Sequence, residues 1–168
     1  MSWCPSCHKP TSSDHKLDCV FCQIAQNVGT DTLVVFEDAE FVAFQDINPA
    51  ALHHFLVIPK SHVDSVKSLT KADVPMVEKM ALIGHTVLDR MKIPTDARRM
   101  GFHIPPFNSI DHLHLHVQSL PYKSSFRGLK YHVSVGTGDH VKGFSWFSEM
   151  TQTITILSRG RRVQVLPC

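Results

Sequence analysis

Histidine and apolar residues alternate strictly over residues 112–117, in the order His-Leu-His-Leu-His-Val. In an extended strand, successive side chains point to opposite faces of the sheet. The pattern therefore predicts a strand whose apolar face is anchored in a core, with His112, His114 and His116 in a row on the other face. A row of imidazoles on a rigid strand is typical of an active site, because catalytic groups need fixed positions.

The composition of the chain is that of an ordinary globular domain. Hydrophobic residues make up 43% of the 168 residues and charged residues 19%. The net charge of +2 gives no electrostatic reason to expect binding to nucleic acid or to a membrane. No apolar run approaches the roughly 18 residues of a membrane span. The N-terminus also lacks the regions of a signal peptide, so we expect a cytoplasmic protein, with the nucleus as a further location.

The apolar pattern along the chain predicts several strands around one long helix. Apolar residues that recur every three or four positions over residues 72–91 predict an amphipathic helix, which Pro94 ends. Past Pro121 the signals weaken, and residues 146–157 fit either a helix or a strand. Segments of strand length lie at residues 32–36, 41–45, 55–58, 99–103 and, more weakly, 131–135. This order favours an α+β domain on a mostly antiparallel sheet.

Three regions follow from changes in composition. Residues 1–18 are polar and rich in proline, serine and threonine, which predicts a flexible N-terminal arm. Residues 19–122 carry the predicted strands and the helix, and so form the domain. Residues 123–168 are expected to be a C-terminal extension packed on that domain, with a frayed tail.

Spacing alone leaves three interpretations of the histidine row open. The histidines are surface or core residues, or they bind a metal, since two histidines at i and i+2 on a strand can reach one zinc ion. The third interpretation is nucleophilic catalysis by imidazole, in which the flanking histidines supply hydrogen bonds to an anionic substrate.

The row also fits the HxHxHxx signature of the histidine triad superfamily of nucleotide hydrolases and transferases. Segments 19–24, 36–49 and 53–62 resemble other parts of that family, in the expected order. Residues 100–111 resemble the histidine triad nucleotide-binding (Hint) proteins that include adenosine phosphoramidases and the plant adenylylsulfatase/phosphorylase type. The resemblance implies a histidine-triad-like fold, with a five-stranded antiparallel sheet and one long helix, often paired as a homodimer.

The resemblance also implies a mechanism without any required cofactor. His114 would attack the α-phosphorus of an adenylate to give a covalent nucleotidyl-imidazole, which water or orthophosphate then cleaves. His116 would donate to a phosphate oxygen. Ser109 and the backbone around Asn108 would hold the phosphate and help to protonate the leaving group. A backbone carbonyl, aided by His54, would keep His114 in one tautomer.

The same resemblance implies a binding site for an adenine nucleotide. Asp46 would accept hydrogen bonds from the ribose hydroxyls, although as a single residue it is more simply an Asp that starts a turn. His103 stands near the phosphate where many relatives have asparagine, and Pro105-Pro106 replaces a glycine-rich loop. These two differences leave the preferred leaving group undetermined. The adenine slot would be lined by Phe21, Ile24, Phe44 and Ile47, which as single residues also fit a core.

The cysteines add a metal site to these expectations. Four residues resemble a Cys2His2 zinc set found in some histidine triad proteins: Cys19, Cys22, His54 and His112. A competing set pairs the first two of these with Cys4 and Cys7, which are otherwise two exposed thiols of the arm. Either set would be structural, because neither leaves an open ligand position.

Three functions remain after these observations. The leading hypothesis is a nucleotide hydrolase or nucleotidyl transferase that acts on adenosine 5′-phosphoramidate or adenosine 5′-phosphosulfate, releasing AMP, or ADP with phosphate. The alternatives are a zinc-dependent hydrolase that uses the histidine row directly, and a non-catalytic nucleotide-binding adaptor. A nucleic-acid partner is not expected, because the basic residues form only a small cluster at residues 159–162.

Overall fold

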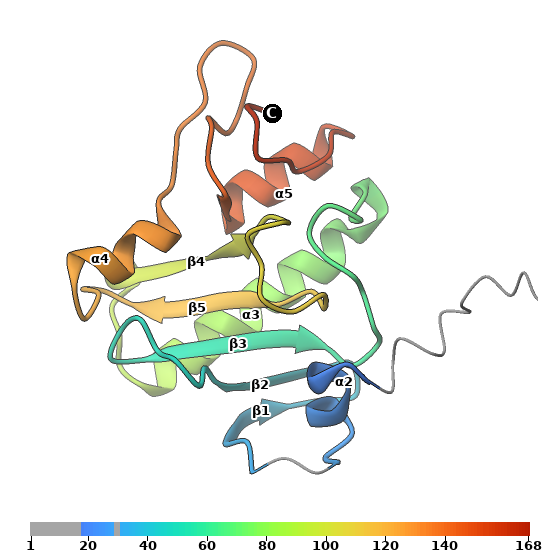
Figure 1. The fold of residues 1–168 in the computed structure, drawn as a ribbon, viewed down its shortest axis with the longest axis vertical. Helices are drawn as coiled ribbons and strands as arrows, with labels where there is room; N and C mark the ends of the chain where they lie inside the picture. Colours follow the sequence, from blue (N-terminus) through green and yellow to red (C-terminus); the bar gives the residue numbers. More distant parts are fainter. Residues whose placement is uncertain (1–17, 29–30) are drawn as a thin grey trace, which may run out of the picture.

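An antiparallel sheet of six strands, in the order β1-β2-β3-β5-β4-β6, forms the centre of the computed structural model (Figure 1). The structure describes residues 18–28 and 31–168, so most of the expected arm, with Cys4 and Cys7, lies outside it. The α+β architecture is confirmed, with one strand more than the five expected. The strands are β1 (Val34–Glu37), β2 (Phe41–Gln45), β3 (His54–Pro59), β4 (Arg98–His103), β5 (Leu115–Ser119) and β6 (Phe147–Glu149).

The predicted long helix is α3 (Val74–Arg90), which lies across one face of the sheet. A capping box between Thr70 and Asp73 closes the short turn that leads into it. Gly84 allows a close approach, because a Cβ there would lie 2.8 Å from Met100 Sδ and 2.9 Å from Val117 Cγ2. The shorter helices are α2 (Val20–Ala25), α4 (Ser125–Gly128) and α5 (Met150–Ser158).

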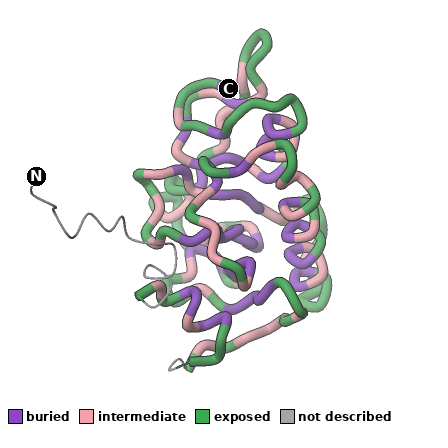
Figure 2. Tube along the Cα trace, turned by 90° about the vertical axis from the view of Figure 1, so that its right-hand side faces the viewer, coloured by how far each residue is buried: buried purple, intermediate pink, exposed green. Residues whose placement is uncertain are grey.

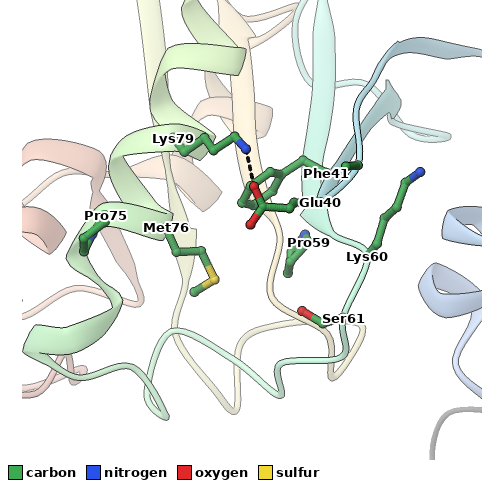
Figure 3. A pocket seen from close by; sticks show the side chains of 9 residues that line it. Glu40, Phe41, Pro59, Lys60, Ser61, Pro75, Met76 and Lys79 are labelled. Atoms are coloured by element: carbon green, nitrogen blue, oxygen red, sulfur yellow. Dashed lines mark hydrogen bonds and ion pairs between the residues drawn. The ribbon is translucent and has the colours of Figure 1, made fainter.

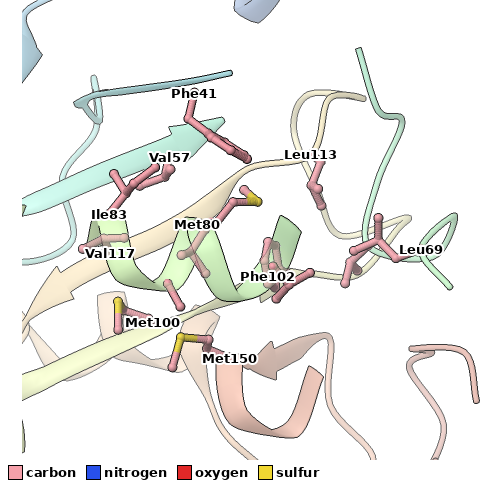
Figure 4. Packing of buried hydrophobic residues seen from close by; sticks show 14 of the residues in the cluster. Phe41, Val57, Leu69, Met80, Ile83, Met100, Phe102, Leu113, Val117 and Met150 are labelled. Carbon is pink, nitrogen blue, oxygen red and sulfur yellow. The ribbon is translucent and has the colours of Figure 1, made fainter. Parts of the chain in front are cut away.

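The two faces of the sheet bury different kinds of residues. On the α3 side, Met80 packs among Val57, Phe102 and Val117 in the main hydrophobic core (Figure 4). On the opposite face, a smaller apolar cluster around α2 adjoins the buried histidines. Figure 2 shows the buried residues concentrated in the strands and on the inward side of the helices. No helix in the described part of the chain combines the length and apolar character needed to cross a membrane.

The histidine strand is shorter than its alternation predicts. Regular pairing begins at Leu115, so His112 and His114 precede β5 and only His116 lies within it. In the β3–β5 register Leu113 would face Pro59, which has no N–H to donate. Pro59 therefore offers no donor to the Leu113 carbonyl, and the Leu113 N–H also leaves the ladder, since it donates to the carbonyl oxygen of Val63 at 2.6 Å.

Residues of the C-terminal extension complete the sheet. In β6, Phe147 pairs with His103 of β4, so the outer edge of β4 is covered by the chain itself. The expected strand at 131–135 is wrong, because residues 129–131 form a 3-10 turn and the segment that follows makes only an isolated bridge. The tail is packed rather than frayed, since Cys168 is buried and exchanges backbone hydrogen bonds with Lys142.

Candidate active site

His114 is held with one ring nitrogen available for chemistry. Its Nδ1 lies 2.7 Å from the carbonyl oxygen of His112, and because a carbonyl can only accept, Nδ1 carries the proton. The lone pair is therefore on Nε2. Burial lowers the pKa of His114, partly offset by the hydrogen bond to the His112 carbonyl, so the ring is neutral at pH 7. A neutral imidazole in a fixed tautomer is the state that a nucleophile requires.

His112 points away from His114, toward two cysteines. Its Nε2–H donates to the carbonyl oxygen of Pro59 at 2.9 Å, which leaves Nδ1 unprotonated, 3.4 Å from Cys19 Sγ and 3.5 Å from Cys22 Sγ. The pKa of His112 is lowered to about 4, chiefly by burial, so this nitrogen keeps its lone pair at neutral pH. His112 thus presents a free ligand atom to two thiols.

The fourth member of this cluster is His62, which corrects the predicted zinc set. Its Nδ1 lies 3.3 Å from Cys22 Sγ, and its Nε2 lies 3.3 Å from Asp64 Oδ1. His54 begins β3 whereas His62 follows the end of that strand, so the two lie at opposite ends and only His62 reaches α2. One group of possible ligand atoms within 4.8 Å of one another comes from Cys19, Cys22, His62 and His112, and a second group comes from Asp46, His54 and His116.

The chemistry of this cluster fits zinc. Two thiolates and two imidazoles form a closed tetrahedral set, which is characteristic of structural zinc. Both imidazoles turn Nδ1 inward and hold the other nitrogen against an oxygen acceptor, Pro59 for one and Asp64 for the other. Such outer hydrogen bonds orient histidine ligands in metal sites. The four residues would tie α2 to the end of β3 and to the start of the histidine row.

A second group of histidines lies on the other side of His114. His116 Nδ1 is 2.9 Å from His54 Nε2, and His116 Nε2 is 2.9 Å from His103 Nδ1. Asp46 Oδ2 lies 3.3 Å from His54 Nε2. The structure therefore places His54 against His116. The contact that fixes the tautomer of His114 is the one to the backbone carbonyl of His112.

The loop before the histidines is where the resemblance places the phosphate. His103, Asn108, His112 and His114 line one small cavity. The Asn108 amide donates to the Ile110 carbonyl at 3.1 Å and to Asp111 Oδ1 at 2.8 Å, which fixes the loop. Ser109 is exposed on this loop, and its contribution to protonating a leaving group stays a prediction.

Three of the four residues expected to line an adenine slot lie together. Phe21, Ile24 and Phe44 are buried in one cluster, with the Phe21 and Phe44 rings 5.4 Å apart. Ile47, by contrast, is fully exposed on the turn after β2. On the same turn, Asp46 accepts a hydrogen bond from the Asn48 backbone N–H at 2.8 Å, so it both starts the turn and faces His54.

A larger cavity of about 420 Å³ lies away from the histidines, near the start of α3 (Figure 3). Lys79 forms an ion pair with Glu40 across it. Phe41, Pro59, Pro75 and Met76 form its apolar lining, and its wall contains neither cysteine nor histidine. The convergent chemistry of the molecule therefore lies on the other face of the sheet.

Burial of uncharged histidines makes the stability of the fold sensitive to acid. Burial is the main cause that lowers the pKa of both His54 and His103 from 6.5 to about 4. Between these values the unfolded chain binds protons that the folded chain does not. We therefore expect the free energy of unfolding to fall, by about 1 kcal/mol per pH unit for each such histidine, as the pH drops from 6.5 toward 4. Urea unfolding at a series of pH values measures this, and a flat profile over that window would contradict it.

Comparisons with known proteins identify the family of the chain. The family described as scavenger mRNA decapping enzyme C-term binding matches residues 18–132. The bifunctional adenosine 5′-phosphosulfate phosphorylase/adenylylsulfatase HINT4 of Arabidopsis thaliana is 44% identical over 67% of this chain and 77% of its own length. The adenosine 5′-monophosphoramidase HINT3 of Danio rerio is 37% identical over 94% of each chain.

Solved structures show the same fold. A HIT family hydrolase from Legionella pneumophila superposes with a TM-score of 0.60 and 27% identity, over 66% of this chain and 100% of that chain. A histidine triad protein from Clostridium difficile gives a TM-score of 0.58 and 27% identity, over 64% and 97%. Together with the family match and the imidazole geometry, these likenesses show that the chain belongs to the histidine triad superfamily, in its Hint-like branch.

Proposed function

We propose that this chain is a nucleotide hydrolase or nucleotidyl transferase that cleaves small adenylates through a covalent adenylyl intermediate on His114. The observation that carries the proposal is the hydrogen bond from this ring to the His112 carbonyl. Nδ1–H is committed to the His112 carbonyl, burial keeps the ring neutral, and Nε2 retains its lone pair beside the cavity of the histidine row.

In the first step, His114 Nε2 attacks the α-phosphorus, so a P–N bond forms as the bond to the leaving group breaks. The imidazole becomes positively charged, and the His112 carbonyl at Nδ1–H stabilises that charge. In the second step, water or orthophosphate attacks phosphorus and the P–N bond breaks, which returns neutral His114 and releases AMP or ADP. The amide leaving group of the phosphoramidate takes up one proton and departs as ammonia, whereas sulfate departs without one, and the attacking water or phosphate loses one proton.

The substrate class is inferred from the site and from the relatives. The buried cluster around Phe21 and Phe44 offers an apolar surface to a nucleobase, and Asp46 offers a carboxylate to ribose hydroxyls. The relatives are named for cleavage of an adenosine phosphosulfate and of an adenosine phosphoramidate. We propose adenosine 5′-phosphosulfate and adenosine 5′-phosphoramidate as the substrates to test first.

A comparison of leaving groups tests the proposal. We expect AMP from both substrates, and ADP from both when orthophosphate is added, because both give the same adenylyl intermediate and phosphate then replaces water in the second step. The kcat/KM values with and without phosphate rank the leaving groups. A base quench during turnover should preserve the adenylyl-imidazole for intact mass analysis, since phosphoramidate bonds survive alkali. Tight AMP binding without turnover on either substrate would instead support the adaptor alternative.

The geometry does not favour a zinc hydrolase built on the histidine row. His112 turns toward the cysteines, while His116 is bonded between two other histidines, so the row does not converge on one point. We propose that zinc, where bound, has a structural role. A homodimer and a cytoplasmic location stay predictions, and strand pairing between two copies would have to use an edge other than that of β4, which β6 covers.

A further inference from the structure

Three imidazoles beside the nucleophile form a continuous hydrogen-bonded chain between two backbone groups. At one end, the Ala50 N–H donates to His54 Nδ1 at 3.1 Å. His54 Nε2 then lies 2.9 Å from His116 Nδ1, and His116 Nε2 lies 2.9 Å from His103 Nδ1. At the other end, His103 Nε2 lies 2.9 Å from the carbonyl oxygen of Lys130.

The two ends fix the direction of every bond in the chain. A backbone N–H can only donate and a carbonyl can only accept. His54 Nδ1 is therefore an acceptor, and the N–H groups lie at Nε2 of His54, His116 and His103 in turn. The Gln118 amide nitrogen is placed 3.2 Å from His54 Nε2, where an N–H group needs an acceptor. The Gln118 side-chain amide is therefore turned by half a turn, which exchanges its nitrogen and oxygen and keeps the same atomic positions.

This arrangement also sets the charge of the chain. An added proton would put two N–H groups face to face in one link, and that link would break. The chain is therefore most stable when all three rings are neutral, in agreement with the burial of His54 and His116. As a result, each of the six ring nitrogens is either protonated or occupied by a donor. Of the four neighbouring imidazoles, which are these three and His114, only His114 keeps a lone pair at Nε2 that the hydrogen-bonded chain does not use.

The C-terminal extension supplies the parts that hold the chain in place. The Lys130 carbonyl also accepts a hydrogen bond from Trp146 Nε1 at 3.1 Å, so it is fixed by two donors. The ring of Tyr131 is buried against all three imidazoles, with centroid distances of 5.1 Å to His103, 5.3 Å to His116 and 5.7 Å to His54. Behind it pack the rings of Tyr122, at 5.6 Å, and Phe147, at 5.5 Å.

We propose that Tyr131 is a positioning residue, which with the Lys130 carbonyl locks the three-histidine chain in one tautomeric direction and so leaves His114 as the one free imidazole nucleophile. The C-terminal extension is then a working part of the site. The kinetic consequence rests on the proposed adenylate chemistry, whereas the tautomers do not depend on any substrate.

The tautomers are measured directly by long-range proton–nitrogen NMR spectra of protein labelled at histidine. We expect the Nε2–H tautomer for His54, His103 and His116, and the opposite Nδ1–H tautomer for His114. An Nδ1–H tautomer at His103 or His116 in the wild-type protein would overturn the proposal. If the tautomers are as expected but the wild-type protein turns over no adenylate, the function has failed and the chain assignment has not.

Two variants separate the ring of Tyr131 from its hydroxyl group. In Tyr131→Phe the ring remains, so we expect unchanged tautomers and kcat within about twofold of wild type. In Tyr131→Leu we expect averaged tautomers at His103 and His116, and kcat lower by about tenfold to a hundredfold, as for a slightly misplaced catalytic group. Phe126→Leu, at an exposed position on α4, is the matched control. Wild-type tautomers and kcat in Tyr131→Leu would overturn the proposal, and if that variant fails to fold, the wild-type spectra remain decisive.

Discussion

Replacing His114 by alanine is expected to abolish turnover of adenylates, with kcat reduced by about 10⁴-fold or more, as is usual when a covalent nucleophile is removed. The three imidazoles beside it cannot replace it. Their nitrogens are engaged with one another and with the backbone, and none presents a free lone pair to the cavity that His114 lines. The adduct trapped by a base quench should disappear together with the activity.

The controls for this experiment are in the chain itself. His140→Ala removes an exposed histidine from the turn that follows Gly138 and should keep wild-type kcat. Thermal unfolding of the His114→Ala variant should show a folded protein, because the backbone of residues 112–114 is held by the Leu113 N–H bond to Val63. If a folded His114→Ala variant kept more than a few per cent of the wild-type kcat, covalent catalysis at this residue would be excluded.

Removing one thiol from the Cys19/Cys22/His62/His112 cluster is expected to cost both the metal and stability. We expect the purified protein to hold about one zinc ion, and Cys22→Ser to lose it, because a three-ligand remainder binds zinc far more weakly. The midpoint of thermal unfolding should fall by about 10 °C, which corresponds to about 3 kcal/mol for a domain of this size. Metal analysis and a thermal scan measure the two effects.

Cys168 provides the matched control for this second experiment. It is also a buried cysteine, but it lies at the end of the chain, outside the cluster. Cys168→Ser should therefore keep the zinc content of the wild-type protein. If wild-type protein that is refolded with added zinc contains no zinc, the metal assignment is contradicted. If Cys22→Ser and the wild-type protein hold equal amounts of zinc, the choice of ligands is contradicted.

The sequence was sufficient for the general outline of the site. Apolar periodicity located the helix that became α3 within two residues at its start and one at its end. The alternation at 112–117 predicted a strand with histidines on one face, although pairing starts only at Leu115 because Pro59 cannot donate to the ladder. Both predictions depend on local patterns, which a single chain carries in full.

Other parts of the site depend on contacts that no local pattern specifies. His54 and His62 are both histidines at the borders of one apolar strand, and only the path of the chain decides which of them reaches the cysteines. Tyr131 follows a segment without clear periodicity, so its position against three imidazoles could not be expected from its neighbours in sequence. A repeated pattern of aromatic residues after the histidine row would have been the sequence signal for this position.

The pairing of β6 with β4 has a consequence for how the protein is made. Strand β4 is synthesised more than forty residues before its partner, so its outer backbone groups at residues 101–103 wait unpaired until β6 leaves the ribosome. An unpaired strand edge is a template for pairing with other chains. A polypeptide interrupted between β4 and β6 would keep such an edge, and would be prone to aggregate even with its histidine row intact.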